Sequence, residues 1–453
     1  MGDSGDAQLN TATEKLDLSD MSHAAATEKA QKAVDELYDF RDHYFARFGL
    51  EKSDKKNKYV ETKMEEVLDL LEKLKGKIVN KAQFCMLKGK TLNVMPDYSN
   101  EAMEILSRAV KFDPKLVEAW NHLGECYWKN GNIPSAKNCF TGALNYQKNK
   151  VSLRNLSMVL RQLSGPPAER VRLVEESVDK AKEAIQLDIK DGVSWVILGN
   201  AYLSLYFVSG QNPMFLKQSM SAYTQAEKDP VAQGNPDLHY NRAVAYKHQE
   251  EYQLALNGFT QAGQLDPGWQ DALDKERELL QFLRGVTEMT QTKGKMKTKK
   301  LESLVQSLSD DGDLGPYHGG SYTGAKGQTI RLVLLKLHEL QPNINKETVV
   351  LGKVVCTIIN PDQVPFTFCM VDCEGTCVPV MVYNIAQGTG VKIGDSVAIP
   401  EPYIQTVDVT HKGEKFNFRS IRVSTPVVMV VNGKKLGADK QAPIVLSLNT
   451  ISD

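Results

Sequence analysis

The stretch Trp120-Asn-His-Leu-Gly-Glu-Cys-Tyr127 decides the fold of this chain. Its large apolar residues recur at intervals of three and four positions, which places them on one stripe of a helix. After a break at Gly131, a second stripe contains Ala136, Phe140 and Ala143. Gly124 and Ala136 are small enough to let the two helices approach closely, and Ala143 leaves room for a further helix. The stretch therefore predicts a pair of short packed helices that stacks on another pair.

The same pattern repeats along residues 81–269. In the successive units the last small residue is Ala109, Ala143, Ala184, Ala226 and Ala262. The shortest interval between these alanines is about 34 residues, the length typical of tetratricopeptide repeats (TPRs). The longer intervals contain the stretched turns Gly165-Pro-Pro167 and Gln211-Asn-Pro213. The sequence therefore predicts five TPR units, which bury their apolar faces on one another in a superhelix.

Helical patterns flank the repeats on both sides. Residues 1–24 are polar and predict a disordered tail, whereas residues 25–80 carry two apolar stripes of helical period and predict an N-terminal helical hairpin. Residues 270–290 have charges on one side and Leu and Phe on the other. This is the pattern of a helix that caps the last apolar surface of a stack.

The hydrophobic period changes to two at residue 328. Short strand-like stretches separated by turns run from 328 to 432 and predict a small β-barrel. The phrase Lys392-Ile-Gly-Asp-Ser-Val-Ala-Ile-Pro400 favours an OB-fold. Residues 291–327 are basic and then rich in Gly and Asp, so we expect a linker there, and 433–453 a C-terminal tail. The predicted class is a multidomain α-then-β protein, an all-α TPR superhelix followed by a small β-barrel.

The composition restricts the partners of the chain. Its 55 basic and 56 acidic residues nearly cancel, so no overall field attracts nucleic acid or a membrane, and any such site must be local. We expect no membrane span and no secretory signal, because no apolar run reaches about 18 residues and the first residues are polar. Seven cysteines, an odd number, indicate a reducing compartment.

Neither a metal site nor an active site is predicted. Three late cysteines are spaced four apart: Cys369, Cys373 and Cys377. Strand-like alternation predicts that they share one sheet face, and no Cys-x-x-Cys pair or nearby histidine completes four ligands, so we expect no zinc and no cofactor. No phosphate loop, dinucleotide motif, nucleophile elbow or zinc-protease motif occurs, which argues against an enzyme. Three histidines on repeat helices are expected at the surface or in a groove: His122, His239 and His248.

TPR stacks bind ligands on the concave face that the first helix of each unit lines. The candidate peptide-binding residues at these positions are Asn121, Glu125, Arg154, Arg161, Asn200, Asp237, Lys247 and Asp271. The pattern predicts a groove that is basic in its middle, where Arg161 can clamp a carboxylate through two hydrogen bonds. At the C-terminal end, Asp237 and Asp271 are suited to an amine or guanidinium. We expect a short peptide with both signs of charge; the alternative for each residue alone is a solvated helix face.

A second candidate site is a run of lysines without any acid: Lys293, Lys295, Lys297, Lys299 and Lys300. It is either a solvated linker, a contact to phosphates of ribosomal RNA or another nucleic acid, or a nuclear import signal.

The barrel itself is a third candidate, for single-stranded nucleic acid, with aromatic residues as stacking platforms: Phe366, Phe368, Tyr383 and Phe418. Balanced charge in this region argues against that alternative. We therefore expect these aromatics in the barrel core and a protein-binding OB domain.

Together these features resemble the tetratricopeptide repeat protein 5 (Strap) family of stress-responsive cofactors, over nearly all of residues 25–432. The resemblance is carried by six strings: Val117-Glu-Ala-Trp-Asn-x-Leu-Gly-Glu-x-Tyr-Trp128, Asn149-Lys-Val-Ser-Leu-x-Asn-Leu-Ser-Met-Val-Leu-Arg-Gln-Leu163, Leu198-Gly-Asn-x-Tyr-Leu-Ser-Leu-Tyr206, Lys293-Gly-Lys-x-Lys-Thr-Lys-Lys300, Pro365-Phe-Thr-Phe368 and Gly394-Asp-Ser-Val-Ala-Ile-Pro-Glu-Pro402.

The resemblance implies two roles and a location in cytoplasm and nucleus. One is an adaptor that joins acetyltransferase coactivators to their junction-mediating, actin-regulatory partner in DNA-damage and heat-stress responses. The other is a ribosome-associated factor that recognises the N-terminal Met-Arg-Glu of nascent tubulins and triggers decay of their mRNAs. In that role Arg161 would clamp the glutamate and Asp237 would meet the positive end, with Asp271, shorter than the carboxylate expected there, beside it. Lys297 and Lys299 would touch ribosomal RNA.

Overall fold

The computed structural model describes residues 21–319, 321–323 and 329–442, so the predicted N-terminal tail lies largely outside the described residues. These residues pack into two compact units. Among the described residues, unit 1 consists of those up to Tyr44 and of Lys55–Lys148, and unit 2 of Phe45–Asp54 and those from Asn149 onward. Each unit is described by itself. In the described part of the chain, no helix is both long enough and apolar enough to cross a membrane.

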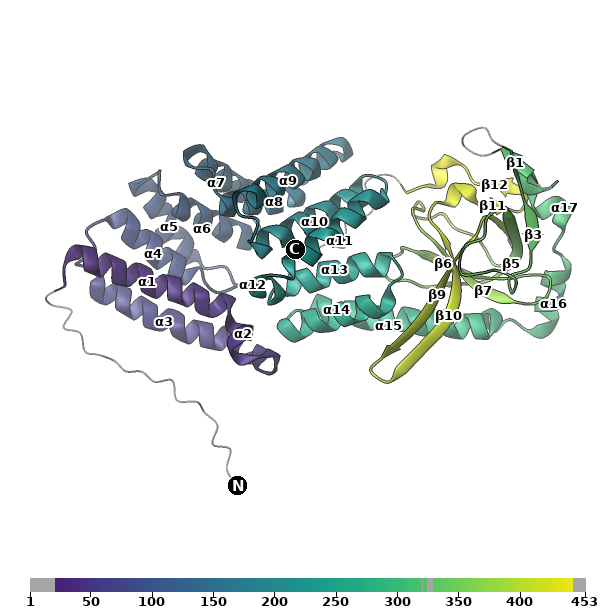
Figure 1. Cartoon of the computed structure of the whole chain (residues 1–453), viewed down its shortest axis with the longest axis horizontal. Coiled ribbons are helices and arrows are strands. Elements are labelled where there is room, and N and C mark those ends of the chain that lie inside the picture. Colours follow the sequence, from purple (N-terminus) through teal and green to yellow (C-terminus); the bar gives the residue numbers. More distant parts are fainter. Residues whose placement is uncertain (1–20, 320, 324–328, 443–453) are drawn as a thin grey trace, which may run out of the picture. The chain divides into compact units, whose positions relative to one another are not determined.

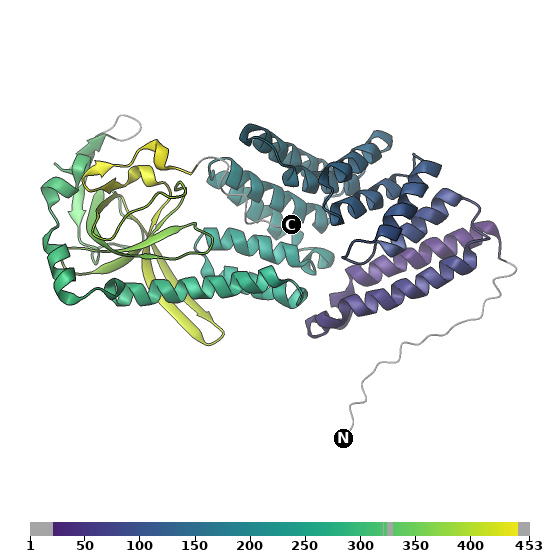
Figure 2. The same cartoon turned by 180° about the vertical axis from the view of Figure 1, so that it is seen from behind.

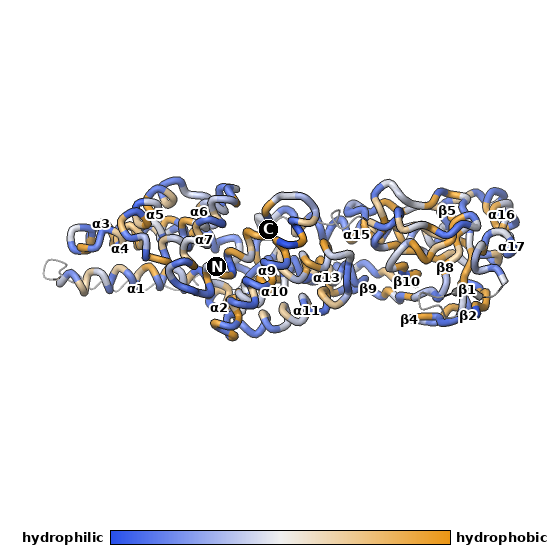
Figure 3. Tube along the Cα trace, turned by 90° about the horizontal axis from the view of Figure 1, so that it is seen from above, coloured by the Kyte–Doolittle hydropathy of each residue, from blue (hydrophilic) through white to orange (hydrophobic). Residues whose placement is uncertain are grey.

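Unit 1 is helical and contains α1 (His23–Asp42), α3 (Lys56–Leu74), α4 (Lys81–Leu92), α5 (Asn100–Phe112), α6 (Val117–Lys129) and α7 (Ile133–Tyr146). The pairs α4–α5 and α6–α7 are the first two repeat units. A Cβ added to Gly124 would lie only 2.5 Å from Cε1 of Phe140, so the glycine is what allows α6 and α7 to pack closely. Hydrophobic and hydrophilic stretches alternate along helices such as α1, as one buried stripe requires (Figure 3).

Unit 2 begins with the short α2 (Tyr44–Phe48) and η2 (Leu50–Lys55) and continues the repeats with α8 (Lys150–Gln162), α9 (Pro167–Leu187), α10 (Gly192–Val208), α11 (Pro213–Ala226), α12 (Pro230–Gln233), α13 (Pro236–His248), α14 (Tyr252–Leu265) and α15 (Gln270–Gln291) (Figure 1). The fourth repeat is long because α10 has 17 residues, against 13 in α8, and because the short α12 precedes α13. Most residues of α10 are buried, because α8, α9, α11 and α13 surround it.

The predicted linker at 291–327 is partly helical. It forms η3 (Lys293–Lys295), α16 (Thr298–Gln306), α17 (Asp310–Asp313) and η4 (Gly315–Tyr317), followed after the turn by β1 (Ser321–Thr323). Apolar residues spaced among the lysines attach it to the barrel: Met296, Leu301, Leu304 and Val305 pack against Val355 and Cys369. Tyr317 Oη donates a hydrogen bond of 2.6 Å to the carbonyl of Val428. The segment therefore packs as part of the β domain. Its apolar stripe was not predicted from the sequence, because lysines dominate the composition of this stretch.

The remaining strands are β2 (Thr329–Arg331), β3 (Val333–Leu335), β4 (Asn343–Ile344), β5 (Thr348–Ile358), β6 (Phe366–Val371), β7 (Cys377–Val382), β8 (Ser396–Pro400), β9 (Tyr403–His411), β10 (Glu414–Val423), β11 (Val430–Val431) and β12 (Lys434–Lys435). Nine of them pair in the order β12-β11-β8-β5-β6-β7-β10-β9-β4, with β7 and β10 parallel. Strand β3 pairs with β5, and β2 pairs with β1 in a separate two-stranded sheet. Only Glu401 and Pro402 separate β8, which pairs with β5, from β9, which pairs with β10. The chain thus closes the curled sheet into a barrel, as the sequence predicted.

The predicted C-terminal tail also contributes to this barrel. β12 pairs with β11, Gln441 bridges to Ile385, and Leu436 packs on the barrel core. Residues 443–453 lie outside the described part of the chain.

The last repeat helices and the barrel share one hydrophobic core. Tyr252 of α14 and Phe282 of α15 pack in the same cluster as Met381 and Tyr383 of the β7 region and Phe418 of β10. Seen from behind, α15 continues from the repeats to lie against the sheet (Figure 2). Of the proposed stacking aromatics, Phe368, Tyr383 and Phe418 are buried, as expected for core residues, which argues against a barrel that stacks bases.

Candidate peptide-binding groove

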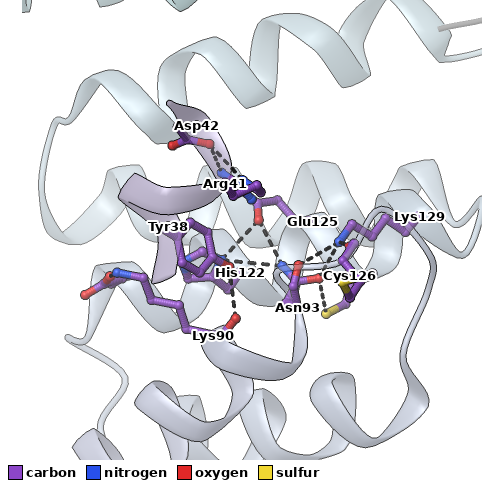
Figure 4. A network of polar contacts seen from close by, with 11 residues as sticks. Tyr38, Arg41, Asp42, Lys90, Asn93, His122, Glu125, Cys126 and Lys129 are labelled. Carbon is purple, nitrogen blue, oxygen red and sulfur yellow. Dashed lines mark hydrogen bonds and ion pairs between the residues drawn. The ribbon is translucent and has the colours of Figure 1, made fainter. Parts of the chain in front are cut away.

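Two predicted groove residues, Asn121 and Glu125, belong to a polar region of unit 1. Asn121 is buried, and Glu125 Oε2 accepts a hydrogen bond of 2.9 Å from Asn93 Nδ2 and lies 3.0 Å from Nδ1 of His122 (Figure 4). Burial opposes the ionised form of Glu125, but His122 and Lys129 outweigh it and lower the pKa of this carboxyl to about 2. Glu125 is therefore a charged, internally bonded residue.

Side chains of α1 join the same network. Tyr38 Oη donates to the carbonyl of Lys90 at 2.9 Å, and the ring of Tyr38 meets the ring of His122 edge-on at 5.7 Å. The guanidinium of Arg41 lies 4.4 Å from the centre of the Tyr38 ring. Lys129 Nζ donates to the backbone carbonyl of Asn93 at 2.8 Å. These contacts tie α1, α4 and α6 together, so Glu125, predicted as a ligand-binding residue, supports the helix packing.

The middle of the predicted groove lies on α8 of unit 2. Arg154 and Arg161 are seven residues apart, which puts them on one face about 10 Å apart along the helix. Arg154 Nη1 forms an ion pair of 3.2 Å with Asp191, the residue that precedes α10. Arg161 lies in the last turn of α8 and is half-buried. Arg154 thus has a structural partner in Asp191.

Asn200 of α10 has a structural role that its sequence position did not reveal. Its side chain is buried, and its Oδ1 accepts a hydrogen bond of 2.8 Å from Tyr223 Oη on α11. The amide therefore joins the two helices of its own repeat unit.

The acidic end of the groove lies where α13 and α15 begin. Asp237 is half-buried in the first turn of α13, and Asp271 is exposed in the first turn of α15. The rings of Tyr240 and Trp269, 4.6 Å apart, hold the start of α15 beside α13. The pKa of Tyr240 is raised to about 12, mainly by burial. The positive charge of Lys275 opposes this increase, and the negative charge of Asp271 adds to it. Two carboxylates therefore stand at neighbouring helix starts.

Lys247 is not an open groove cation. Its ammonium forms an ion pair with Asp362, which lies in the loop between β5 and β6, and Lys275 of α15 pairs with the same carboxylate. Lys247 is 9% exposed. The sequence had no signal for this partner, which lies 115 residues further along the chain.

The lysine run is held on the surface of the β domain. Gly294 has φ of 69°, and a Cβ there would approach the carbonyl oxygen of Val355 to 2.8 Å, so the chain passes directly over β5. Lys295 pairs with Glu288 at 2.7 Å. Three others are exposed at the start of α16 and have no acidic partner within the described residues: Lys297, Lys299 and Lys300. Cations at a helix start oppose the helix dipole, so bound phosphate would relieve this repulsion.

Cysteines and histidines differ from their predicted positions. Cys369 is buried on β6 and Cys377 begins β7, and the two pack in one cluster on the same side of the sheet. Cys373 is exposed in the turn between them, so only two of the three share a sheet face. Among residues 21–319, 321–323 and 329–442, no group of His, Cys, Asp and Glu is arranged to hold a metal ion. His239 and His248 are buried, because both lie where a neighbouring element covers the helix face.

These features define a TPR protein with an appended OB domain, a class that mediates protein–protein contacts and generally acts as a scaffold without enzymatic activity. The family model described as Tetratricopeptide repeat protein 5 OB fold domain matches residues 331–445, and a tetratricopeptide repeat model matches residues 117–150.

Curated relatives specify the family. The chain is 51% identical to the human Tetratricopeptide repeat protein 5 over 417 residues, which cover 92% of this chain and 94% of that protein. It is 52% identical to the mouse protein over the same shares of both chains. The chain therefore belongs to the tetratricopeptide repeat protein 5 family. A thermophilic TPR protein of Thermus thermophilus is similar at 17% identity and a TM-score of 0.37, over 44% of this chain and 99% of that one.

Proposed function

We propose that this chain is a non-enzymatic adaptor that recognises the Met-Arg-Glu N-terminus of nascent tubulins on ribosomes and acts in the decay of tubulin mRNAs. The observation that carries the proposal is the order of charges on successive first helices of the repeats in unit 2. Arg161 stands on α8, and Asp237 and Asp271 stand on the later first helices α13 and α15. A peptide with a cation next to an anion matches that order.

The chemistry of each contact supports this assignment. A guanidinium binds a carboxylate through two parallel hydrogen bonds, and hydrogen bonds to charged groups contribute about 1.5–3 kcal/mol each. Asp237 and Asp271 are suited to the peptide's arginine or its terminal amine. Arg161→Ala should therefore weaken peptide binding by roughly 10- to 100-fold.

The test is a titration of a fluorescent Met-Arg-Glu-Ile peptide, followed by anisotropy. Arg172→Ala is the matched control, because Arg172 is an exposed arginine on α9, the second helix of the same repeat unit. We expect the native protein and Arg172→Ala to bind equally and Arg161→Ala to lose binding at unchanged thermal stability. Equal affinities of all three proteins would refute the groove assignment.

We propose that the exposed lysines of α16 supply the ribosome contact. Reversal of Lys297 and Lys299 to glutamate should weaken co-sedimentation with ribosomes and lower the salt dependence of binding by about two units of slope. Lys434→Glu with Lys435→Glu on β12 is the control, since both residues are exposed cations of the same domain. Peptide affinity should remain unchanged. If peptide and ribosome binding fall together, the two sites are not separate.

We propose a second, nuclear role as a stress-responsive cofactor scaffold for acetyltransferase coactivators and their actin-regulatory partner, with the protein in both cytoplasm and nucleus. Family membership and an OB domain in which Phe368, Tyr383 and Phe418 are buried support protein binding over nucleic-acid binding. Fractionation before and after DNA damage, with co-precipitation of the coactivators, tests it. A protein confined to the cytoplasm under both conditions would refute this role.

A further inference from the structure

A loop of the β domain reaches the acidic end of the groove. Between β5 and β6, Asn360 organises the loop: its Nδ2 donates to the carbonyl of Pro365 at 3.2 Å, and its backbone carbonyl accepts from Gln363 N at 2.9 Å. Asn360 Oδ1 also accepts from the backbone N of Asp362 at 3.3 Å. The loop is thus held by its own hydrogen bonds and presents the Asp362 side chain to α13 and α15.

The carboxylate of Asp362 bridges two lysines of the repeat helices. Its Oδ2 pairs with Lys247 Nζ, and its Oδ1 pairs with Lys275 Nζ. The exposed fractions of the three side chains are 17% for Asp362, 11% for Lys247 and 19% for Lys275. Burial alone would raise the pKa of Asp362, but the two ammonium groups outweigh it and lower the pKa, so the residue is ionised at neutral pH.

Both lysines share a helix face with the acidic groove residues. On α13, Lys247 is in the stripe of Asp237 and Tyr240, with residues spaced by three and four positions. On α15, Lys275 follows Asp271 by four positions, which places it on the same face one turn further. Lys275 also pairs with Glu278 at 3.1 Å, and Lys247 lies in the last turn of α13, about 15 Å along the helix from Asp237. Without Asp362, Lys247 would lose its carboxylate partner and Lys275 would keep Glu278 alone, so the positive charge next to Asp271 would rise. With Asp362 present, this end of the groove keeps a net negative charge.

We propose that Asp362 of the β domain is a specificity-determining residue of the groove: by neutralising Lys247 and Lys275 it makes the α13–α15 end select a cationic peptide residue. The inference rests on the proposed function, because it assigns the reading of the peptide's arginine to this end. It makes the OB domain part of the recognition site, since this domain supplies one of the charges that define the site.

The experiment compares three peptides on the full chain: Met-Arg-Glu-Ile, the same peptide with norleucine for arginine, and the same peptide with glutamate for arginine. The native protein should prefer them in that order. In Asp362→Asn the two lysines lose the carboxylate that they share, so affinity for the arginine peptide should fall about three- to tenfold, and affinity for the glutamate peptide should rise. The neutral peptide should change least.

Two further variants separate charge from architecture. Glu414→Gln removes the ion pair of Glu414 with Arg284, another contact between repeats and β domain, and should leave the peptide preference unchanged. Lys247→Gln with Lys275→Gln, added to Asp362→Asn, should restore the preference for arginine. An unchanged preference in Asp362→Asn, or a failure of the triple variant to restore it, overturns the inference. If the native protein binds none of the peptides, the proposed function itself fails.

Discussion

Arg422→Ala is the change that tests how the β domain is held on the repeats. Arg422 Nη1 donates to Glu250 Oε1 at 2.7 Å, and Nη2 donates to the carbonyl of His248 at 3.1 Å. The guanidinium carbon also lies 3.8 Å from the centre of the Tyr383 ring. The side chain of Glu250 is 0% exposed. Alanine would remove all three contacts and leave this carboxylate buried without its cation.

Breaking a buried ion pair from one side costs about 3–5 kcal/mol, and we expect the free energy of unfolding at pH 7.5 to fall by that amount. The loss should depend on pH. Burial raises the pKa of Glu250 although Arg422 opposes this, and removal of Arg422 raises it further. When a carboxyl has a higher pKa in the folded than in the unfolded state, the free energy of unfolding falls as the pH rises between the two pKa values. The deficit of the variant should therefore be smaller at pH 5 than at pH 7.5.

Urea unfolding followed by circular dichroism at both pH values measures this effect. Arg284→Ala is the control, because its ion pair with Glu414 is exposed and such pairs contribute at most about 1 kcal/mol. Replacing the pair by apolar residues, Glu250→Leu with Arg422→Met, should recover most of the loss. If Arg422→Ala costs no more than Arg284→Ala, or costs the same at both pH values, the buried-pair argument is refuted.

Two further predictions concern unit 1. Gly124→Ala should lower the free energy of unfolding by about 1–3 kcal/mol, because the new Cβ would clash with Phe140. Gly142→Ala is the control, because its Cβ would be 3.5 Å from the ring of Trp120, an ordinary contact. In thermal melts of both variants, the control should be as stable as the native protein or more stable. Because the pKa of Glu125 is lowered to about 2 in the fold, its contribution to stability is present above about pH 4.5 and disappears as the pH falls towards 2. Glu125→Gln should flatten the dependence of stability on pH in that window, and an unchanged acid titration would contradict the network.

The sequence predicted those parts of the fold that rest on local periodicity. The repeat offsets located the helix pairs, and two-residue alternation located the β domain at residues 328–432. In both cases the side-chain period follows from the backbone geometry of the element itself, so a single stretch of sequence contains the signal.

Contacts between distant elements had no such signal. Lys247 satisfies the TPR groove pattern, yet its partner is a loop carboxylate of the barrel. Asn200 likewise satisfies the groove pattern, but a tyrosine of the next helix binds it. In α16, the lysines indicated a charged linker, whereas Leu301 and Val305, four residues apart on one helix face, pack the helix against the barrel. A sequence pattern indicates the face on which a side chain stands, whereas the partner depends on the tertiary arrangement.

The shared core of α14, α15 and the barrel determines which piece of this protein can be exchanged between relatives. A fragment that ends after α15 would expose Tyr252 and Phe282 to water, and an isolated barrel would expose Met381 and Phe418, so each half would tend to aggregate. The transplantable module therefore runs from α13 to β12 and includes both the acidic end of the groove and the loop that faces it. A mutation in the repeat helices at this shared core requires a compensating mutation in the barrel, and the reverse, so we expect repeats and barrel to be inherited together.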